Sequence, residues 1–172
     1  MNAETLPFAD RRSRTPAARL SGFTLLELML VITIVAILAG IGVPSFSRFI
    51  AEQRVHAAAS DLQAALWRAR SESIRLNRDV VLAPLNADVG WESGWAATST
   101  AVPGVELIRR DPMTAVTLST RQTDVTYRAS GRLRGQTGSA AFEVASKSDA
   151  GAKKRCIRIE PSGQPTVREG GC

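Results

Sequence analysis

The chain has 172 residues, of which 44% are hydrophobic and 22% charged, with a formal net charge of +6 and an isoelectric point near 10.3. This length allows one domain of usual size, or a smaller domain with an appendage. Two cysteines and one histidine exclude a dense disulfide scaffold, a four-cysteine zinc site and most histidine-based metal centres. We therefore expect neither a metal nor a cofactor. The mean hydropathy of -0.03 is typical of soluble proteins, but the apolar residues are unevenly distributed.

Residues 1–22 form a basic segment with four arginines and two acidic residues, and they predict a solvated leader. The next 21 residues, Phe23 to Val43, are apolar except for Glu27. As a helix they span roughly 31 Å, about the thickness of a bilayer core. Because the arginines precede this span, the positive-inside rule predicts a cytoplasmic N-terminus, a single pass of the inner membrane and a periplasmic C-terminal domain. A buried core helix and a secretory signal cut after the apolar run are the open alternatives.

The junction at residues 22–27 reads GFTLLE and resembles the class III leader of type IV pilins and type II secretion pseudopilins. This resemblance implies that a prepilin peptidase cuts after Gly22 and that the new N-terminal residue, Phe23, is N-methylated. It also implies that Glu27 pairs with the N-terminal amine of a neighbouring subunit during assembly. Independently, a carboxylate in a membrane helix costs about 2.5–3.5 kcal/mol, so it usually has a partner. A glutamate that reaches the lipid headgroups is the alternative.

A proline lies near the end of the apolar span. Pro44 follows two glycines, Gly40 and Gly42, and proline removes one helical hydrogen bond and kinks a helix. A kink at this distance from the junction is also similar to the pilin family. The alternative is a first helix that ends at Val43.

The segment 45–76 lacks proline and glycine and predicts an amphipathic helix that continues the membrane helix. Residues 23–44 are then the transmembrane half and residues 45–76 the periplasmic half. The apolar positions follow the i, i+3, i+4, i+7 pattern: Val55, Ala58, Leu62, Ala65, Leu66 and Ala69. On the opposite face we expect Arg68 and Glu72 to form a weak pair. The single histidine, His56, is interpreted as solvated.

Residues 77–172 predict a β-rich domain, because short β-prone runs alternate with Gly, Pro and Asp turn signals. These runs are 80–84, 94–98, 105–108, 115–120, 124–129, 140–145, 156–160 and 165–169. Their spacing predicts an antiparallel sheet packed on the long helix, an α+β fold. Trp91 and Trp95 lie in the string GWESGW, which resembles a string in minor pilins of the FimT, FimU and GspH type. They either cover an edge of the core or form a binding platform.

Cys156 and Cys172 are the only cysteines, and in an oxidising periplasm we expect them to form one disulfide that closes the C-terminal tail. Such a loop stabilises the fold by roughly 3 kcal/mol in the chain-entropy model. Two free thiols are the alternative. Their spacing suits neither metal binding nor redox catalysis.

Excess positive charge lies in residues 128–172, with nine basic and four acidic residues, whereas residues 47–127 have nine of each. A basic surface attracts phosphates through counterion release, without sequence specificity. The candidate DNA-binding residues are Arg132, Arg134, Lys153, Lys154, Arg155 and Arg158. The alternative is a solvated surface, or one that docks an acidic neighbour.

Residues 131–134 have the form of a Gly-Arg-x-Arg motif through which some FimT-type pilins bind DNA. That motif can instead correspond to residues 162–165, where Gln164 stands in place of an arginine.

No catalytic constellation is recognisable, and we do not expect an enzyme. The resemblance implies a minor pilin incorporated into a type IV pilus, at or near the tip. Two alternatives are the pseudopilin H of a type II secretion system and a pilus-borne, non-specific DNA receptor for natural transformation. The expected partners are other pilins or pseudopilins, the prepilin peptidase, the inner membrane and DNA.

Overall fold

The computed structural model describes residues 22–100, 102–135 and 139–172. One long α-helix, α1 (Leu25–Leu76), precedes a short 3-10 helix, η1 (Trp91–Ser93), and a series of strands. The chain divides into a unit that ends at Gly40 and a second unit, Ile41–Cys172. Most of the expected leader, residues 1–21, lies outside the described residues.

The first half of α1 is apolar and exposed. Every side chain from Gly22 to Phe49 is exposed, and the helix is long and apolar enough to cross a membrane. The helix begins with a cap, because the Thr24 hydroxyl accepts a hydrogen bond from the Glu27 amide at 3.2 Å. It runs through Pro44, so the alternative of a helix that ends before this proline is wrong. The kink itself stays a prediction.

The second half of α1 is amphipathic, as the periodicity predicts. All six expected apolar positions are buried: Val55, Ala58, Leu62, Ala65, Leu66 and Ala69. His56 is exposed. The expected pair of Arg68 with Glu72 is wrong, because Glu72 instead binds Arg75, with 2.6 Å between Nη2 and Oε2. Helical residues three apart are neighbours, just as residues four apart are, so Glu72 can reach Arg75 as readily as Arg68.

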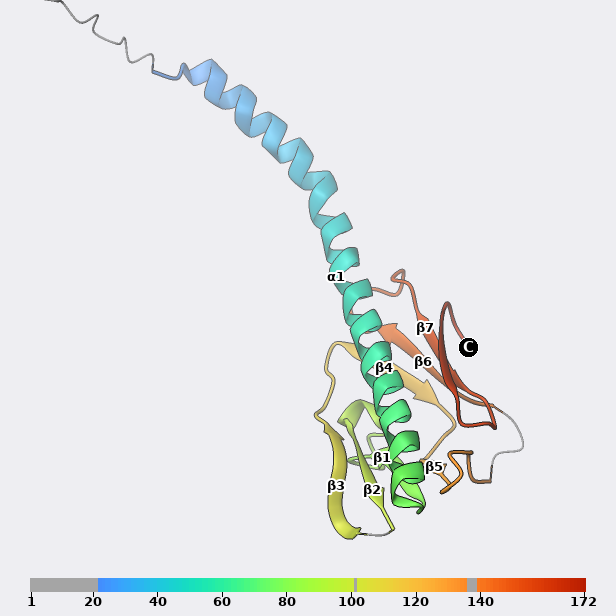
Figure 1. Ribbon diagram of the computed structural model, residues 1–172. Helices are drawn as coiled ribbons and strands as arrows, with labels where there is room; N and C mark the ends of the chain where they lie inside the picture. Colours follow the sequence, from blue (N-terminus) through green and yellow to red (C-terminus); the bar gives the residue numbers. More distant parts are fainter. Residues whose placement is uncertain (1–21, 101, 136–138) are drawn as a thin grey trace, which may run out of the picture. The chain divides into compact units, whose positions relative to one another are not determined.

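All eight expected runs contain strands. Their bounds are β1 (Val80–Pro84), β2 (Trp95–Ser99), β3 (Val102–Arg110), β4 (Val116–Thr120), β5 (Val125–Tyr127), β6 (Ala140–Ser146), β7 (Arg155–Ile159) and β8 (Pro165–Glu169). They form two antiparallel sheets of four strands, in the orders β3-β2-β1-β5 and β4-β6-β7-β8. In Figure 1 the second half of α1 crosses in front of both, with β2 and β3 on one side and β6 and β7 on the other. The sequence pattern led us to expect a single sheet.

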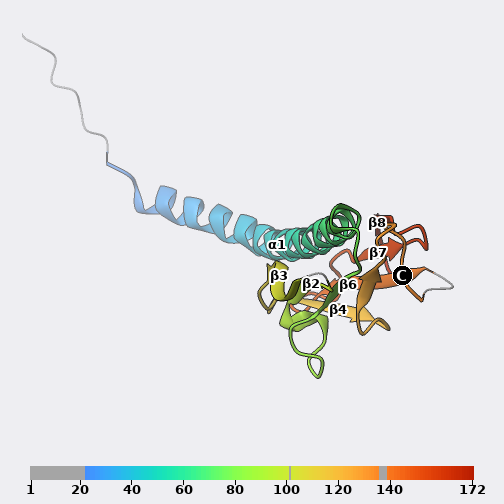
Figure 2. The same cartoon turned by 60° about the horizontal axis from the view of Figure 1, so that its bottom comes forward.

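The core lies between the apolar face of α1 and the two sheets, and Figure 2 shows the second half of α1 above the strands. Trp91 and Trp95 are both buried, which favours the core interpretation over a binding platform. The Trp91 indole donates a 2.7 Å hydrogen bond to the carbonyl oxygen of Gln122. Its ring meets Phe142 edge-on, with 4.9 Å between ring centroids.

The C-terminal tail is fastened to the outer face of the second sheet. Cys156 in β7 forms a disulfide with Cys172, with 5.1 Å between their Cα atoms, which is the pairing that the sequence indicates. Glu143 in β6 accepts hydrogen bonds from the Cys172 amide at 3.1 Å and from Lys154 Nζ at 2.8 Å. These contacts hold the pKa of Glu143 below its ordinary value, and the hydrogen bond from Lys154 has the largest effect.

Candidate functional site

Arg70 joins the C-terminal part of α1 to two turns of the β domain. Its Nε donates to the carbonyl oxygen of Gly131 at 3.0 Å, and its Nη2 donates to that of Ser162 at 3.3 Å. The two turns also contact each other, because the Leu133 amide donates to the carbonyl oxygen of Pro161 at 3.3 Å. The two segments that compete for the Gly-Arg-x-Arg resemblance, 131–134 and 162–165, therefore lie side by side.

Both turns require a glycine. Gly131 has φ +75°, and a Cβ there would lie 2.7 Å from Cδ1 of Ile74 in α1. Gly163 has φ +86°, and its Cβ would overlap the carbonyl oxygen of Gly131. A side chain at either position would be strained by its backbone angle and would separate elements that now touch. The first turn is closed by a 2.9 Å hydrogen bond from the Arg128 amide to the carbonyl oxygen of Arg132.

An exposed tryptophan lies beside Arg70. The Arg70 guanidinium carbon is 5.5 Å from the centroid of the Trp67 ring, within the range of a cation–π interaction. The Trp67 side chain is 39% exposed. Both hydrogen bonds that Arg70 donates go to neutral carbonyl oxygens, so they position the guanidinium without cancelling its charge.

Four of the six predicted DNA-binding residues are paired with carboxylates. Arg134 binds Asp79, with 2.9 Å between Nη1 and Oδ2. The other three pairs lie near the tail: Lys153 with Glu169 at 2.9 Å, Lys154 with Glu143 at 2.8 Å, and Arg155 with Glu169 at 3.6 Å. A paired cation attracts phosphate less, so the segment 153–155 contributes less positive potential than its sequence indicates.

The remaining two candidates, Arg132 and Arg158, are exposed and form no ion pair with any described residue. They occupy different elements. Arg132 belongs to the turn that Arg70 holds, and Arg158 lies on β7, opposite Ala141 and Thr166 of the neighbouring strands. The structure therefore does not gather the six residues into one surface.

The arginine cluster around Arg70 contains residues that sequence reasoning missed. We define the Arg70 cluster as Trp67, Arg70, Arg128 and Arg132; Arg128 is exposed and, within the described part of the chain, has no ion pair. Helical periodicity places Trp67 outside the apolar stripe, which was the one available signal. The contact between this part of α1 and residues 128–132 is tertiary, so no local pattern indicates it. Glu160 begins the second turn and adds one carboxylate at this end of the domain.

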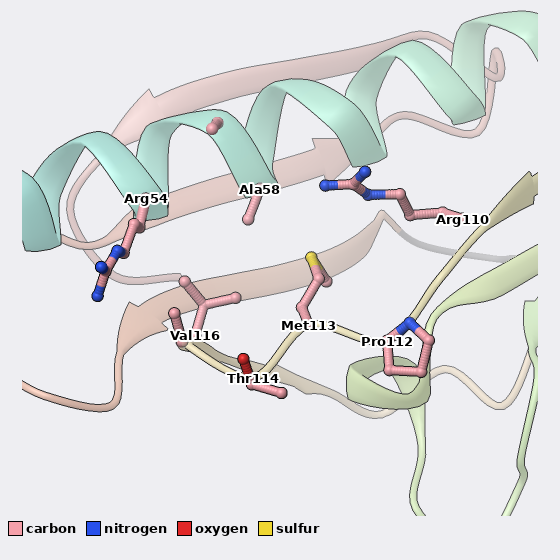
Figure 3. A pocket seen from close by; sticks show the side chains of 9 residues that line it. Arg54, Ala58, Arg110, Pro112, Met113, Thr114 and Val116 are labelled. Carbon is pink, nitrogen blue, oxygen red and sulfur yellow. The ribbon is translucent and has the colours of Figure 1, made fainter.

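A small groove lies between α1 and the segment that follows β3. Its volume is about 240 Å³. In Figure 3 the Met113 side chain points toward Ala58 of α1, between Arg54 and Arg110. Arg110 is held by Asp61, with 2.8 Å between Nη2 and Oδ2, whereas Arg54 forms no ion pair with a described residue. The groove has room for one apolar side chain. Across the described ranges, no group of three or more His, Cys, Asp or Glu side chains could hold a metal.

The architecture defines the class of protein. A long helix, apolar and exposed in its first half and packed on an antiparallel β domain in its second half, is the pilin fold. Residues 19–43 match the prokaryotic N-terminal methylation motif, and residues 58–163, more than half of the chain, match the model of the type II transport protein GspH. The chain therefore belongs to the GspH family of type IV pilins and pseudopilins, whose members assemble with one another in filaments.

Solved structures share this fold. The type IV minor pilin FimU of Pseudomonas aeruginosa superposes with a TM-score of 0.57 at 23% identity, over 70% of this chain and 92% of that one. The minor pseudopilin EpsH of the Vibrio cholerae type 2 secretion system gives 0.51 at 10% identity, over 69% and 97%.

A curated relative from Pseudomonas aeruginosa, named as a fimbrial protein, is 32% identical over 78 residues, 45% of this chain and 50% of the relative. The chain spans about half the length of the curated relatives it matches. The apolar helix together with the leader motif indicates membrane anchoring and a place in a pilus or pseudopilus.

Proposed function

We propose that this chain is a minor pilin that is incorporated into a type IV pilus through α1. The observation that carries the proposal is the first half of α1, which is exposed throughout and has a single charged residue, Glu27, between Leu25 and Ser47. In water such a surface requires a cover, and the two available covers are lipid before assembly and neighbouring helices in a filament. The match to a fimbrial protein supports the pilus over other filaments.

The proposal includes processing and topology. A prepilin peptidase removes residues 1–22 by cutting after Gly22, and Phe23 becomes the methylated N-terminus on the cytoplasmic side of the inner membrane. The new amine then lies one helical turn from Glu27, and Pro44 provides a kink beyond the span. Intact mass of membrane-extracted protein tests the cleavage. Gly22→Val should leave the full-length mass, and a wild-type chain that still begins at Met1 would contradict the proposal.

The alternative is a pseudopilin H of a type II secretion system, which the family model and the fold of EpsH support. Deletion of the gene in its native host separates the two functions. A minor pilin predicts fewer surface pili and normal export of secreted enzymes, and a pseudopilin predicts the reverse. Immunogold labelling of pili would show whether the subunit lies at or near the tip, as we propose for the pilin.

A second candidate function is non-specific DNA binding by the assembled filament. It is supported by the uncompensated guanidinium groups of Arg132 and Arg158 and by the net charge of +4 that residues 23–172 carry. Phosphate contacts of this kind weaken steeply with salt. Fluorescence anisotropy of labelled DNA across a salt series tests it, with Arg132→Gln and Arg158→Gln each expected to lower the salt slope by about one counterion. Absence of binding at low salt would leave the filament role alone.

A further inference from the structure

We propose that the Arg70 cluster binds single-stranded nucleic acid, with a base stacked on the ring of Trp67 and phosphates contacted by Arg128 and Arg132. The inference rests on the proposed nucleic-acid function and adds to it a site, a strand preference and a stacking residue. It combines three features that the structure brings together: an exposed aromatic ring, guanidinium groups without carboxylate partners, and a turn fastened to the helix beside that ring.

The first feature is the exposure of Trp67. The other two tryptophans are buried, with 3% and 1% of their surfaces exposed, whereas Trp67 is 39% exposed on the solvent side of α1. A large exposed apolar ring is the usual platform on which unpaired bases stack. Its exposed neighbours Arg68 and Ser71 are polar, and Ile74, two turns further along α1, is the other large apolar side chain exposed on this part of the helix.

The second feature is the way in which Arg70 orders that ring. Its guanidinium is fixed by two carbonyl acceptors, those of Gly131 and Ser162, and it lies over the Trp67 ring at 5.5 Å. A ring that is already ordered loses less conformational entropy when a base stacks on it. Arg70 is therefore a positioning residue, which acts on the base through Trp67.

The third feature is the sign and availability of the charge. Arg128 and Arg132 are exposed and form no ion pair with any described carboxylate, unlike Lys153, Lys154 and Arg155. A phosphate approaching the cluster meets positive charge that is not already neutralised. A second copy of this chain would bring the same charges and, without residues 1–22, a net charge of +4, so charge favours a polyanion over self-association.

A single strand fits this site better than a duplex. In a duplex each base is stacked on its neighbours, so its faces are not available to Trp67, whereas an unpaired base can stack on the ring. Arginines on the adjacent turn can follow the backbone of the same strand. We therefore expect oligothymidylate to bind more tightly than a duplex of equal phosphate number.

The test uses the full chain in detergent micelles with fluorescein-labelled oligothymidylate, followed by anisotropy and by tryptophan fluorescence. Stacking should quench Trp67, the one exposed indole of the three. Trp67→Ala should weaken binding about tenfold with an unchanged salt slope, since it removes a stacking contact and no phosphate contact. Trp67→Phe should recover part of the affinity and guards against a folding defect.

Arg70→Lys separates positioning from charge. It keeps the positive charge but loses the fork that reaches both carbonyl oxygens, so quenching should fall while the salt slope stays the same. Arg132→Gln should lower the slope by about one counterion. Two matched controls, Val89→Ala at an exposed apolar site and Lys153→Gln at a paired lysine, should change little.

The outcomes distinguish the inference from the function on which it rests. If Arg132→Gln weakens binding and Trp67→Ala does not, the stacking site is wrong and non-specific DNA binding stands. If no oligonucleotide binds at low salt, both are wrong. If Trp67→Ala leaves binding intact and lowers recovery in sheared filaments, the ring contacts another subunit and the inference is overturned.

Discussion

Arg110 Nη2 lies 2.8 Å from Oδ2 of Asp61, an ion pair that joins the end of β3 to the middle of α1. Both side chains are about half exposed, at 49% and 43%, so water screens their attraction. We expect Asp61→Asn to lower the free energy of unfolding by about 0.2–1 kcal/mol, as measured by urea denaturation in detergent. The control is Glu106→Gln, which removes a pair within β3. A loss above about 2 kcal/mol would show that this pair is more than a surface contact.

Gly163→Ala should be among the most destabilising single-methyl additions in the β domain. The position has φ +86°, and the new Cβ would overlap the carbonyl oxygen of Gly131, so the two turns would have to separate. We expect a loss of about 2–4 kcal/mol in thermal or urea unfolding. Gly170→Ala is the matched control, because it also has positive φ but open space around it, and its cost should be about 1–2 kcal/mol. Equal costs would contradict the close approach of the turns.

The tail should loosen in acid. The pKa of Glu143 is lowered below 4.5, first by the hydrogen bond from Lys154 and then by that from the Cys172 amide. A lowered carboxyl pKa means that the folded state is stabilised above the unfolded pKa, and that this contribution is lost as the pH falls through the folded pKa. The protection of residues 170–172 against hydrogen exchange, measured relative to the intrinsic rate at each pH, should therefore fall below pH 4.5.

Glu143→Gln tests the origin of that pH dependence. The variant should exchange faster at neutral pH and lose most of the acid response, because glutamine does not titrate. Glu160→Gln is the control, at a carboxylate without an ion pair among the described residues. An unchanged acid response in Glu143→Gln would assign the effect to another group.

Glu27→Ala should leave membrane insertion intact and lower incorporation into filaments. The substitution makes the span more apolar, which favours insertion, and it removes the carboxylate expected to pair with the amine of a neighbouring subunit. The fractions in membranes and in sheared pili, compared by immunoblot, give both quantities. Leu30→Ala, a neutral change on the same exposed segment, is the control. Wild-type recovery of Glu27→Ala in sheared pili would show that the assembly role is wrong.

Local sequence patterns were sufficient to predict the secondary-structure elements of this fold. The 3.6-residue period of Val55 to Ala69 and the turn residues that separate the β-prone runs each depend on neighbours in sequence, so the second half of α1 and all eight strands could be predicted. The division into two sheets could not, because strand order depends on pairings between distant segments. β5 pairs with β1, where Val125 lies opposite Leu82, rather than with β4, which precedes it in sequence.

Ion pairing also could not be predicted from local sequence. The run Lys153-Lys154-Arg155 is conspicuous in the sequence, but its carboxylate partners, Glu143 and Glu169, are supplied by adjacent strands. Conversely, Trp67 and Arg70 look like ordinary residues of a solvated helix face. Their position against the turn at Gly131 depends on a tertiary contact across 61 residues.

The two sheets are interleaved along the chain, and this interleaving constrains how the domain forms. β4 belongs to the second sheet but is synthesised before β5, which completes the first. A chain released up to residue 120 has three strands of one sheet, a single unpaired strand of the other, and a helix face that covers both. Neither sheet has all of its strands until later segments of the chain are available. The contacts that complete the domain are therefore long-range and form late. We expect folding of this domain to be slow and all-or-none, and C-terminal truncations to be degraded rather than to persist as partly folded fragments.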